Sequence, residues 1–241
     1  MASDTKRPTA FSHAGWWVPG SLEAGWSRTF QANFNDISNK FQQLGIVPLV
    51  KSLPGGPDVG FYFSEAEYDF LQLLTVAGSQ PPAPGRRLPT LPMVAYSIWL
   101  ASQGWGHFSP ISLLQVQGVT DELAAVQPSG SQEFPCGWYL VGSLAAAWYQ
   151  DVPGNYETAR LKRQELGLAD VSPLYFAEST LYDCIQLVQA PTQPAGQGPD
   201  EGAVAAYAAW FATQAYGHLS FVPFLSPDLV EAALLQAGRN P

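Results

Sequence analysis

The residues best suited to chemistry are two histidines in matching surroundings. His107 lies in Gly106-His107-Phe108-Ser109 and His218 lies in Gly217-His218-Leu219-Ser220, out of three histidines in the chain. Each follows a segment that we expect to be helical, and the partial negative charge at a helix C-terminus stabilises an imidazolium ion. Such a histidine could act as an acid, a base or a ligand. The alternative is structural, with the glycine ending the helix and the histidine packing back on it.

Two aspartates are the expected partners of these histidines. Asp69 and Asp183 each follow a tyrosine in an otherwise apolar segment that we interpret as a helix. A buried carboxylate without a partner is costly, so we expect the pairs Asp69–His107 and Asp183–His218. Each pair could be a dyad in which the carboxylate orients a base, or a structural contact between two helices. If the two pairs met, they could hold zinc, manganese or iron, although no motif with metal-ligand spacing is present and no cofactor is predicted.

Four glutamines on the predicted helices complete the candidate ligand-binding set. Repeated amides can bind a polar ligand or seal a contact between helices. The candidate residues are therefore Asp69, Gln72, Gln103, His107, Asp183, Gln186, Gln214 and His218. Nucleophile motifs are absent from the sequence: no Gly-x-Ser-x-Gly occurs, and the acidic neighbour of Cys184 would raise its thiol pKa.

These candidates belong to a long internal repeat. Matching segments occur in the same order in both halves of the chain: 15–26 with 137–148, 40–45 with 162–167, 68–74 with 182–188 and 99–109 with 210–220. Phe63 also matches Phe176. The repeat predicts a tandem duplication, with a first unit at 1–127 and a second at 128–241. We expect the units to pack with pseudo-twofold symmetry and to share one core.

Each unit is interpreted as four helices, which predicts a mainly α protein with only minor short β structure. Apolar residues spaced three or four apart predict one long helix over 22–44, and its counterpart from Ser143 is expected to break at Pro153-Gly154. The second helix carries Asp69 or Asp183. The third runs over 93–103 or 203–214, and the fourth begins at Thr120 or Ser226. Short strands near 60–63 and 174–176 are the predicted β structure.

Bulk composition narrows the classes of function. The chain has 20 acidic and 11 basic residues, a net charge of −9, and 46% hydrophobic residues. An acidic surface disfavours nucleic acid and would suit a basic protein as partner. Neither a signal peptide nor an apolar run of about 20 residues is apparent, and there are only two cysteines, so we expect a soluble cytoplasmic protein without a membrane partner.

Two hypotheses of different classes follow. The first is a soluble non-catalytic binding protein (an inhibitor, an immunity-type protein or an adaptor) that acts through an acidic, aromatic-rich surface. The alternative is an enzyme or a small-ligand or metal-binding protein whose site lies between the repeats and uses Asp69, His107, Asp183 and His218. Neither the oligomeric state nor a reaction follows from the sequence.

Overall fold

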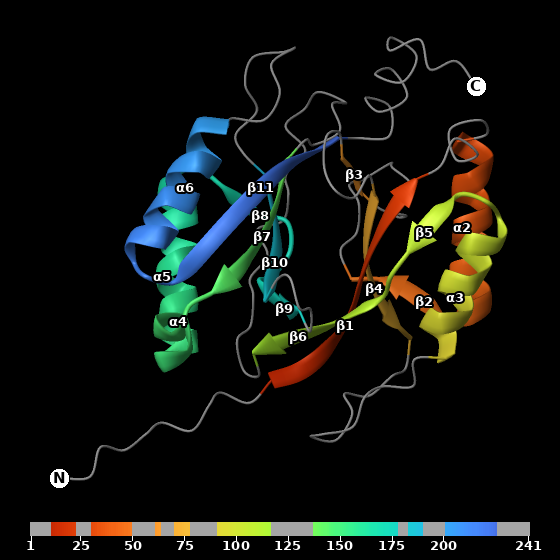
Figure 1. The fold of residues 1–241 in the computed structure, drawn as a ribbon, viewed down its shortest axis with the longest axis horizontal. Helices are drawn as coiled ribbons and strands as arrows, with labels where there is room; N and C mark the ends of the chain where they lie inside the picture. The colour runs from red at the N-terminus through yellow and green to blue at the C-terminus, as the bar shows by residue number, and fades with distance from the viewer. Residues whose placement is uncertain are drawn as a thin grey trace.

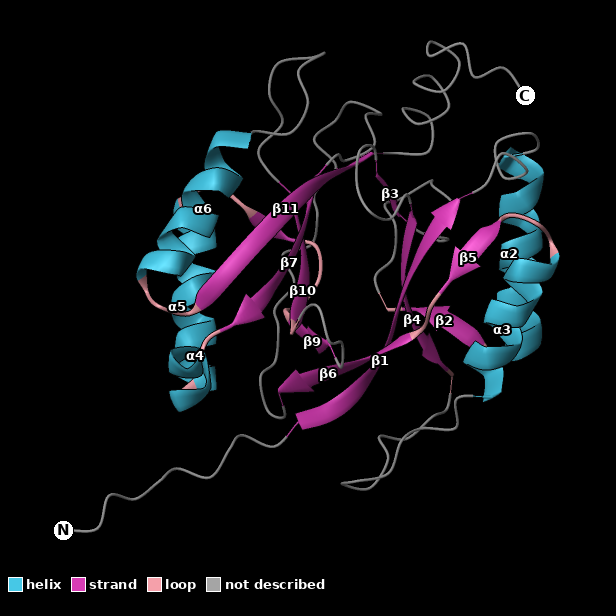
Figure 2. Ribbon diagram, viewed as in Figure 1, coloured by secondary structure: helices cyan, strands magenta, loops and turns pink. Residues whose placement is uncertain are grey.

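The computed structural model describes residues 11–22, 30–49, 61–63, 70–77, 91–116, 137–177, 183–189 and 201–225. These residues form five helices and eleven strands, and every pairing between the strands is antiparallel. The prediction of a mainly helical protein built from four-helix units is therefore wrong. Helices lie on two opposite sides of the molecule with the strands between them (Figures 1 and 2).

Each half of the chain contains the same order of elements. The first half comprises β1 (Phe11–Leu22), α2 (Phe30–Leu44), β2 (Ile46–Pro48), β3 (Phe61–Phe63), β4 (Phe70–Val76), α3 (Leu91–Ser102), β5 (Gly106–Phe108) and β6 (Ile111–Val116). The second half comprises β7 (Gly137–Leu144), α4 (Ala146–Gln150), α5 (Val152–Glu165), β8 (Ala169–Asp170), β9 (Tyr175–Ala177), β10 (Cys184–Gln189), α6 (Glu201–Thr213) and β11 (Gly217–Leu225). The long strand β11 takes the place of both β5 and β6.

The segments predicted as the second helix of each unit are strands. β4 and β10 are mostly apolar, each with a glutamine at its third residue (Gln72 and Gln186), and both faces of each strand are buried. Leu73 packs into one apolar cluster, whereas the next residue, Leu74, packs into another on the opposite face. A run of this length that is apolar on both faces has no period to distinguish it from a buried helix, which explains the error.

Eight strands form a closed ring. The pairings run β1–β4–β3–β11–β7–β10–β9–β6 and return to β1. The short strands β2, β5 and β8 extend this ring by pairing with β4, β1 and β10. Two pairings join the halves, because β3 of the first pairs with β11 of the second and β9 of the second pairs with β6 of the first.

The strand registers of the two halves are equivalent. Val18 pairs with Gln72 as Leu140 pairs with Gln186, and Ser21 pairs with His107 as Ser143 pairs with His218. The joining pairs are equivalent too, since Leu114 faces Phe176 and Leu225 faces Tyr62. Tyr62, rather than the predicted Phe63, is therefore the counterpart of Phe176. Its neighbour Phe63 corresponds to Ala177.

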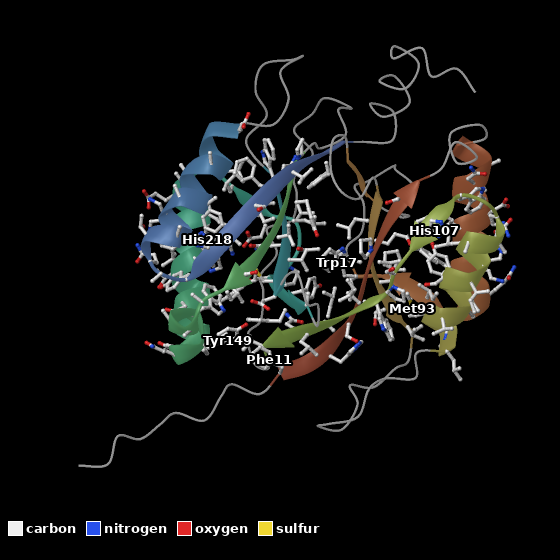
Figure 3. The ribbon with its side chains drawn as sticks, in the orientation of Figure 1. Phe11, Trp17, Met93, His107, Tyr149 and His218 are labelled. Carbon is white, nitrogen blue, oxygen red and sulfur yellow. The ribbon has the colours of Figure 1, made fainter. Side chains whose placement is uncertain are left out.

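Three apolar layers stabilise this arrangement. The inner layer fills the ring with residues from both halves, including Trp17, Leu73, Tyr139 and Leu187, and Trp17 lies near the middle of the molecule (Figure 3). One outer layer packs α2 and α3 against β1 and β4. The other packs α5 and α6 against β7 and β10. One inner core is thus shared by both halves.

Most remaining helix predictions can be compared with the structure. α3 and α6 lie where third helices were predicted, and α4 and α5 are separate helices with the break at Asp151, just before Pro153-Gly154. The predicted long first helix is shorter, because Leu22 belongs to β1 and α2 begins at Phe30. The predicted fourth helices from Thr120 and Ser226, and the predicted boundary at 127–128, lie outside the described residues.

A matched pair of helix ends gives a first test. Gly104 follows α3 with φ +68°, and its counterpart after α6 is Ala215 with φ +58°. A left-handed conformation costs a residue with a Cβ atom about 1 kcal/mol relative to glycine. We expect Ala215→Gly to raise the free energy of unfolding by about 1 kcal/mol and Gly104→Ala to lower it by a similar amount, measured by urea denaturation. A lower stability for Ala215→Gly would contradict this account.

Candidate functional site

The two candidate histidines do not meet. His107 in β5 and His218 in β11 are exposed and lie on opposite sides of the molecule (Figure 3). Asp69 lies outside the described residues. The geometry therefore gives no shared centre with two histidines between the two halves.

Asp183 is held by the backbone of β7. Its carboxylate accepts a hydrogen bond from the N–H of Leu144 at 3.0 Å, and its own N–H donates to the carbonyl of Gly142 at 2.8 Å. His218 pairs with Ser143 on the other edge of β7. Asp183 and His218 thus flank β7 at the same level, on its two sides, and the carboxylate serves to fix the start of β10.

The glutamines divide into two exposed and two buried residues. Gln103 and Gln214 follow α3 and α6, where each amide contacts its own helix end, through Ser102 at 3.1 Å and Thr213 at 3.4 Å. Gln72 and Gln186 are buried in β4 and β10. Both lie on strands rather than on the predicted helices: Gln72 accepts a hydrogen bond from Tyr96 of α3, whereas Gln186 donates to Asp170 of β8.

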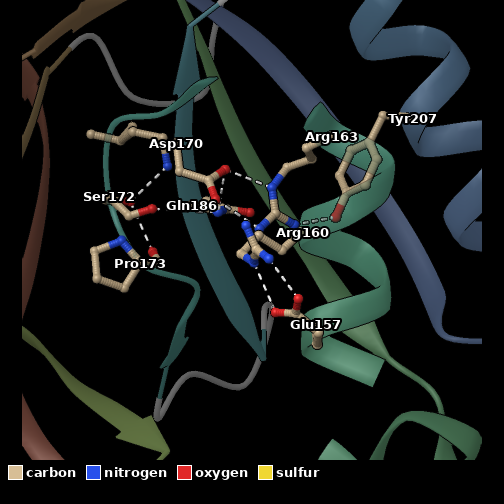
Figure 4. A network of polar contacts seen from close by, with 9 residues as sticks. Glu157, Arg160, Arg163, Asp170, Ser172, Pro173, Gln186 and Tyr207 are labelled. Atoms are coloured by element: carbon tan, nitrogen blue, oxygen red, sulfur yellow. Dashed lines mark hydrogen bonds and ion pairs between the residues drawn. The ribbon is translucent and has the colours of Figure 1, made fainter. Parts of the chain in front are cut away.

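A largely buried ion pair is the centre of a polar network in the second half. Arg163 of α5 is fully buried, and it donates from Nε to Asp170 of β8 at 2.6 Å and from Nη2 to the other carboxylate oxygen at 3.0 Å. This two-point geometry is the strong form of a charge-assisted hydrogen bond (Figure 4). Burial alone would lower the pKa of Arg163, but the contacts with Tyr207 and Asp170 raise it overall, so the guanidinium stays charged.

The network extends to the helix and strands around it. Arg163 donates from Nη1 to the hydroxyl of Tyr207 in α6 at 2.8 Å. Gln186 donates to Asp170 at 3.2 Å and to the carbonyl of Ser172 at 3.3 Å, and the Ser172 hydroxyl accepts the N–H of Leu187 at 2.8 Å. The cluster therefore connects α5, α6, β8 and β10 (Figure 4).

The first half lacks the ion pair at the equivalent place. Phe41 stands where the second half has Arg163, and its ring lies 5.1 Å from that of Tyr96 between centroids. The hydroxyl of Tyr96 donates directly to Gln72 at 2.9 Å. The same helix–sheet junction is thus built once from packed rings and once around a charge, which indicates a structural role for Arg163.

Cys184 is poorly suited to nucleophilic chemistry. Burial, with a further contribution from the charge of Asp183, raises the pKa of its thiol to about 12. The side chain is buried against the carbonyl of Gly142. A thiol with this pKa carries almost no thiolate at neutral pH, and the thiolate is the nucleophilic form.

The outer surface of α3 is unusually apolar. Leu91, Val94 and Ile98 have exposed fractions of 75%, 43% and 65%, and no charged residue occurs in the helix. The equivalent positions of α6 are Gly202, Ala205 and Ala209. Since α6 packs on its sheet without large side chains there, the fold itself does not require them on α3. We call Leu91, Val94, Ala95, Ile98 and Ala101, which are all exposed, the α3 outer face.

Comparisons with known proteins do not place the chain in a family. No protein-family model matches the chain, and a search of curated proteins finds no relative. Within the described ranges, no cluster of three or more His, Cys, Asp or Glu residues could hold a metal ion. No helix in the same part of the chain is both long enough and apolar enough to cross a membrane.

Sequence reasoning missed the Arg163 cluster and the α3 outer face. Both could have been found by comparing the repeats position by position. Phe41 differs from Arg163 at a place where the surrounding residues match, and Leu91 differs from Gly202 at equivalent positions of the third helical segment. Neither feature was predicted, because only polar residues that occur in both halves were taken as candidates.

The ion pair gives a second test. Arg163→Met leaves the partly buried carboxylate of Asp170 with only the amide of Gln186 as a donor, so we expect a loss of about 3 kcal/mol in the free energy of unfolding. Adding Asp170→Ala should recover part of that loss, because the uncompensated charge is gone. Denaturant titration of the two single variants and the double variant measures the coupling. If the loss in the double variant equalled the sum of the losses in the two single variants, the two residues would not be coupled, and the role given to the pair would be contradicted.

The third test concerns the histidine hypothesis. His218 is exposed and Asp183 is held by backbone contacts, so we expect His218→Ala to change stability by less than about 0.5 kcal/mol. Asp183→Ala removes the acceptor of the Leu144 N–H and should cost about 1 kcal/mol. Thermal unfolding followed by calorimetry separates the two. A large loss for His218→Ala would support the structural Asp–His pair instead.

Proposed function

We propose that the protein is a non-catalytic binding protein, of the inhibitor, immunity or adaptor type, and that the α3 outer face is its contact surface. The observation that carries this proposal is the exposure of Leu91, Val94 and Ile98 where α6 has only Gly202, Ala205 and Ala209. Contiguous exposed apolar residues on one helix are typical of interaction sites. An uncharged helix with these side chains exposed provides the apolar centre of such a contact.

The chemistry of the partner follows from the charge of the whole chain. A net charge of −9 attracts a basic protein over a distance, whereas the α3 outer face supplies the short-range apolar contact. A partner that fits both the net charge and the apolar face presents an amphipathic helix, with apolar residues on one side and lysines or arginines around them. A ligand or metal site between the repeats has less support, because His107 and His218 lie on opposite sides.

A designed peptide tests the surface and the partner chemistry together. The probe is a fluorescein-labelled amphipathic helix with leucines on one face and lysines on the other, and its control carries glutamates in place of the lysines. We expect the lysine peptide to bind, and Leu91→Asp with Ile98→Asp to weaken binding at least tenfold, because apolar contact is lost and charge must be desolvated. Fluorescence anisotropy measures both affinities.

The internal repeat supplies the matched control for this experiment. Ala205→Asp with Ala209→Asp adds two charges at exposed positions of α6, the counterparts of Val94 and Ile98. This variant should leave peptide binding unchanged. High salt should weaken the complex with the lysine peptide. Equal losses for the α3 and α6 variants, or equal binding of the lysine and glutamate peptides, would overturn the proposal. Circular dichroism checks that both variants remain folded.

A further inference from the structure

We infer that a binding site for an organic ammonium ion is formed by the rings of Phe11, Phe176 and Tyr149 and the carboxylate of Asp183. Phe11 belongs to β1 of the first half, whereas Phe176 of β9, Tyr149 of α4 and Asp183, just before β10, belong to the second. The site therefore lies where the halves meet, beside the pairing of β6 with β9. It lies away from α3 and uses neither of the candidate histidines (Figure 3).

The three rings contact one another in a row. Phe11 meets Phe176 at an angle of 68° with 4.8 Å between ring centroids, and the ring of Tyr149 lies 6.4 Å from that of Phe176. Phe176 is buried, whereas Phe11 and Tyr149 have exposed fractions of 36% and 46%. The position that corresponds to Tyr149 in the first repeat is Ser27, so this ring occurs in one half only. The row thus presents two aromatic side chains to solvent on either side of a buried ring.

The backbone places Asp183 beside this row. The N–H of Ala177, the residue after Phe176, donates to the carbonyl of Asp183 at 2.8 Å. The N–H of Leu144, just before α4, donates to the Asp183 carboxylate at 3.0 Å. Burial, and in addition the charge of Asp183, raises the pKa of the Tyr149 hydroxyl, as a carboxylate close to that side chain would. Negative charge is therefore present next to the exposed ring.

Within the described ranges, no lysine or arginine pairs with Asp183. Four such side chains occur there, and each is engaged elsewhere. Lys40 lies over the ring of Trp99, and the other three cations form the ion pairs Arg160–Glu157, Lys162–Glu165 and Arg163–Asp170. Asp183 itself is half-buried. A carboxylate that is partly removed from water and has no cation beside it favours the binding of one.

The combination of rings and charge selects the class of ligand. The faces of aromatic rings attract cations, and organic ammonium groups are the ligands that such rings recognise best. An anion would be repelled by Asp183, and a neutral apolar ligand would cover the carboxylate without compensating its charge. An ammonium group that carries methyl or methylene groups contacts the rings and neutralises the carboxylate at the same time.

Choline is the probe for this site, and its neutral isostere, in which a carbon atom replaces the nitrogen, is the control ligand. Saturation-transfer NMR of the full chain, with irradiation of its aromatic protons, measures transfer to the methyl groups of each ligand. We expect choline to bind with a dissociation constant on the order of a few millimolar, and the isostere to bind at least about fivefold more weakly because it lacks the charge. Absence of transfer to choline, or equal binding of the two ligands, would overturn the inference.

Substitutions separate the ring from the charge. Tyr149→Leu and Asp183→Asn should each weaken choline binding about fivefold, whereas Tyr149→Phe keeps the ring and should keep the affinity. Asp183→Asn retains an oxygen that can accept the Leu144 N–H. The matched controls are Leu161→Ala, which removes an exposed apolar side chain, and Glu165→Gln, which removes an exposed acid, and neither should affect binding. Losses in the controls equal to those in Tyr149→Leu and Asp183→Asn would contradict the assignment.

The ammonium group could belong to a small molecule or to a lysine side chain of a protein partner, and the lysine peptide distinguishes these sources. A lower affinity of Tyr149→Leu for that peptide assigns the group to a lysine, whereas a lower affinity for choline alone assigns it to a small molecule. Leu91→Asp with Ile98→Asp should leave choline binding unchanged, and a loss there would overturn the separate site. Failure of this inference is thus distinguishable from failure of the proposed function.

Discussion

The structure depends on the exchange of strands between the two halves of the chain. β3 of the first half pairs with β11, and β9 of the second half pairs with β6. These two pairings close the ring, and the closed ring buries the inner faces of β1, β4, β7 and β10 in one shared core. Neither half alone could cover Trp17 or Tyr139 in this way. In the described residues, the two halves therefore share one inner core rather than forming two separate ones.

The crowding within the closed sheet explains why particular glycines recur in the repeat. A Cβ atom on Gly142 would meet the backbone carbonyl oxygen of His218 on the neighbouring strand, and one on Gly20 would meet the ring of Phe108. Glycine is required where a neighbouring strand approaches this closely. Both contacts involve the strand that carries a candidate histidine, so the recurrence of glycine at these two positions follows from close packing of neighbouring strands.

The elements that could be predicted from the sequence are those whose apolar residues follow a clear spacing. The helices α3 and α6 were predicted within two residues at each end, because buried residues such as Tyr96 and Tyr207 recur at helical spacing. The strands β4 and β10 were mistaken for helices because both faces are buried, which removes the alternation that marks a strand. The short β3 and β9 were found from aromatic runs. The strand exchange could not be predicted, because pairing between distant segments leaves no local pattern.

The two halves differ at two places that the shared fold does not require to differ. At the inner junction the first half has Phe41 and Tyr96, whereas the second has Arg163, Asp170 and Tyr207. At the outer surface the relation is reversed: the first half exposes large apolar side chains on α3 and the second exposes alanines on α6. Since both halves satisfy the same fold, its packing cannot explain the exposed leucine and isoleucine. The contact that we propose for the α3 outer face would account for these exposed side chains.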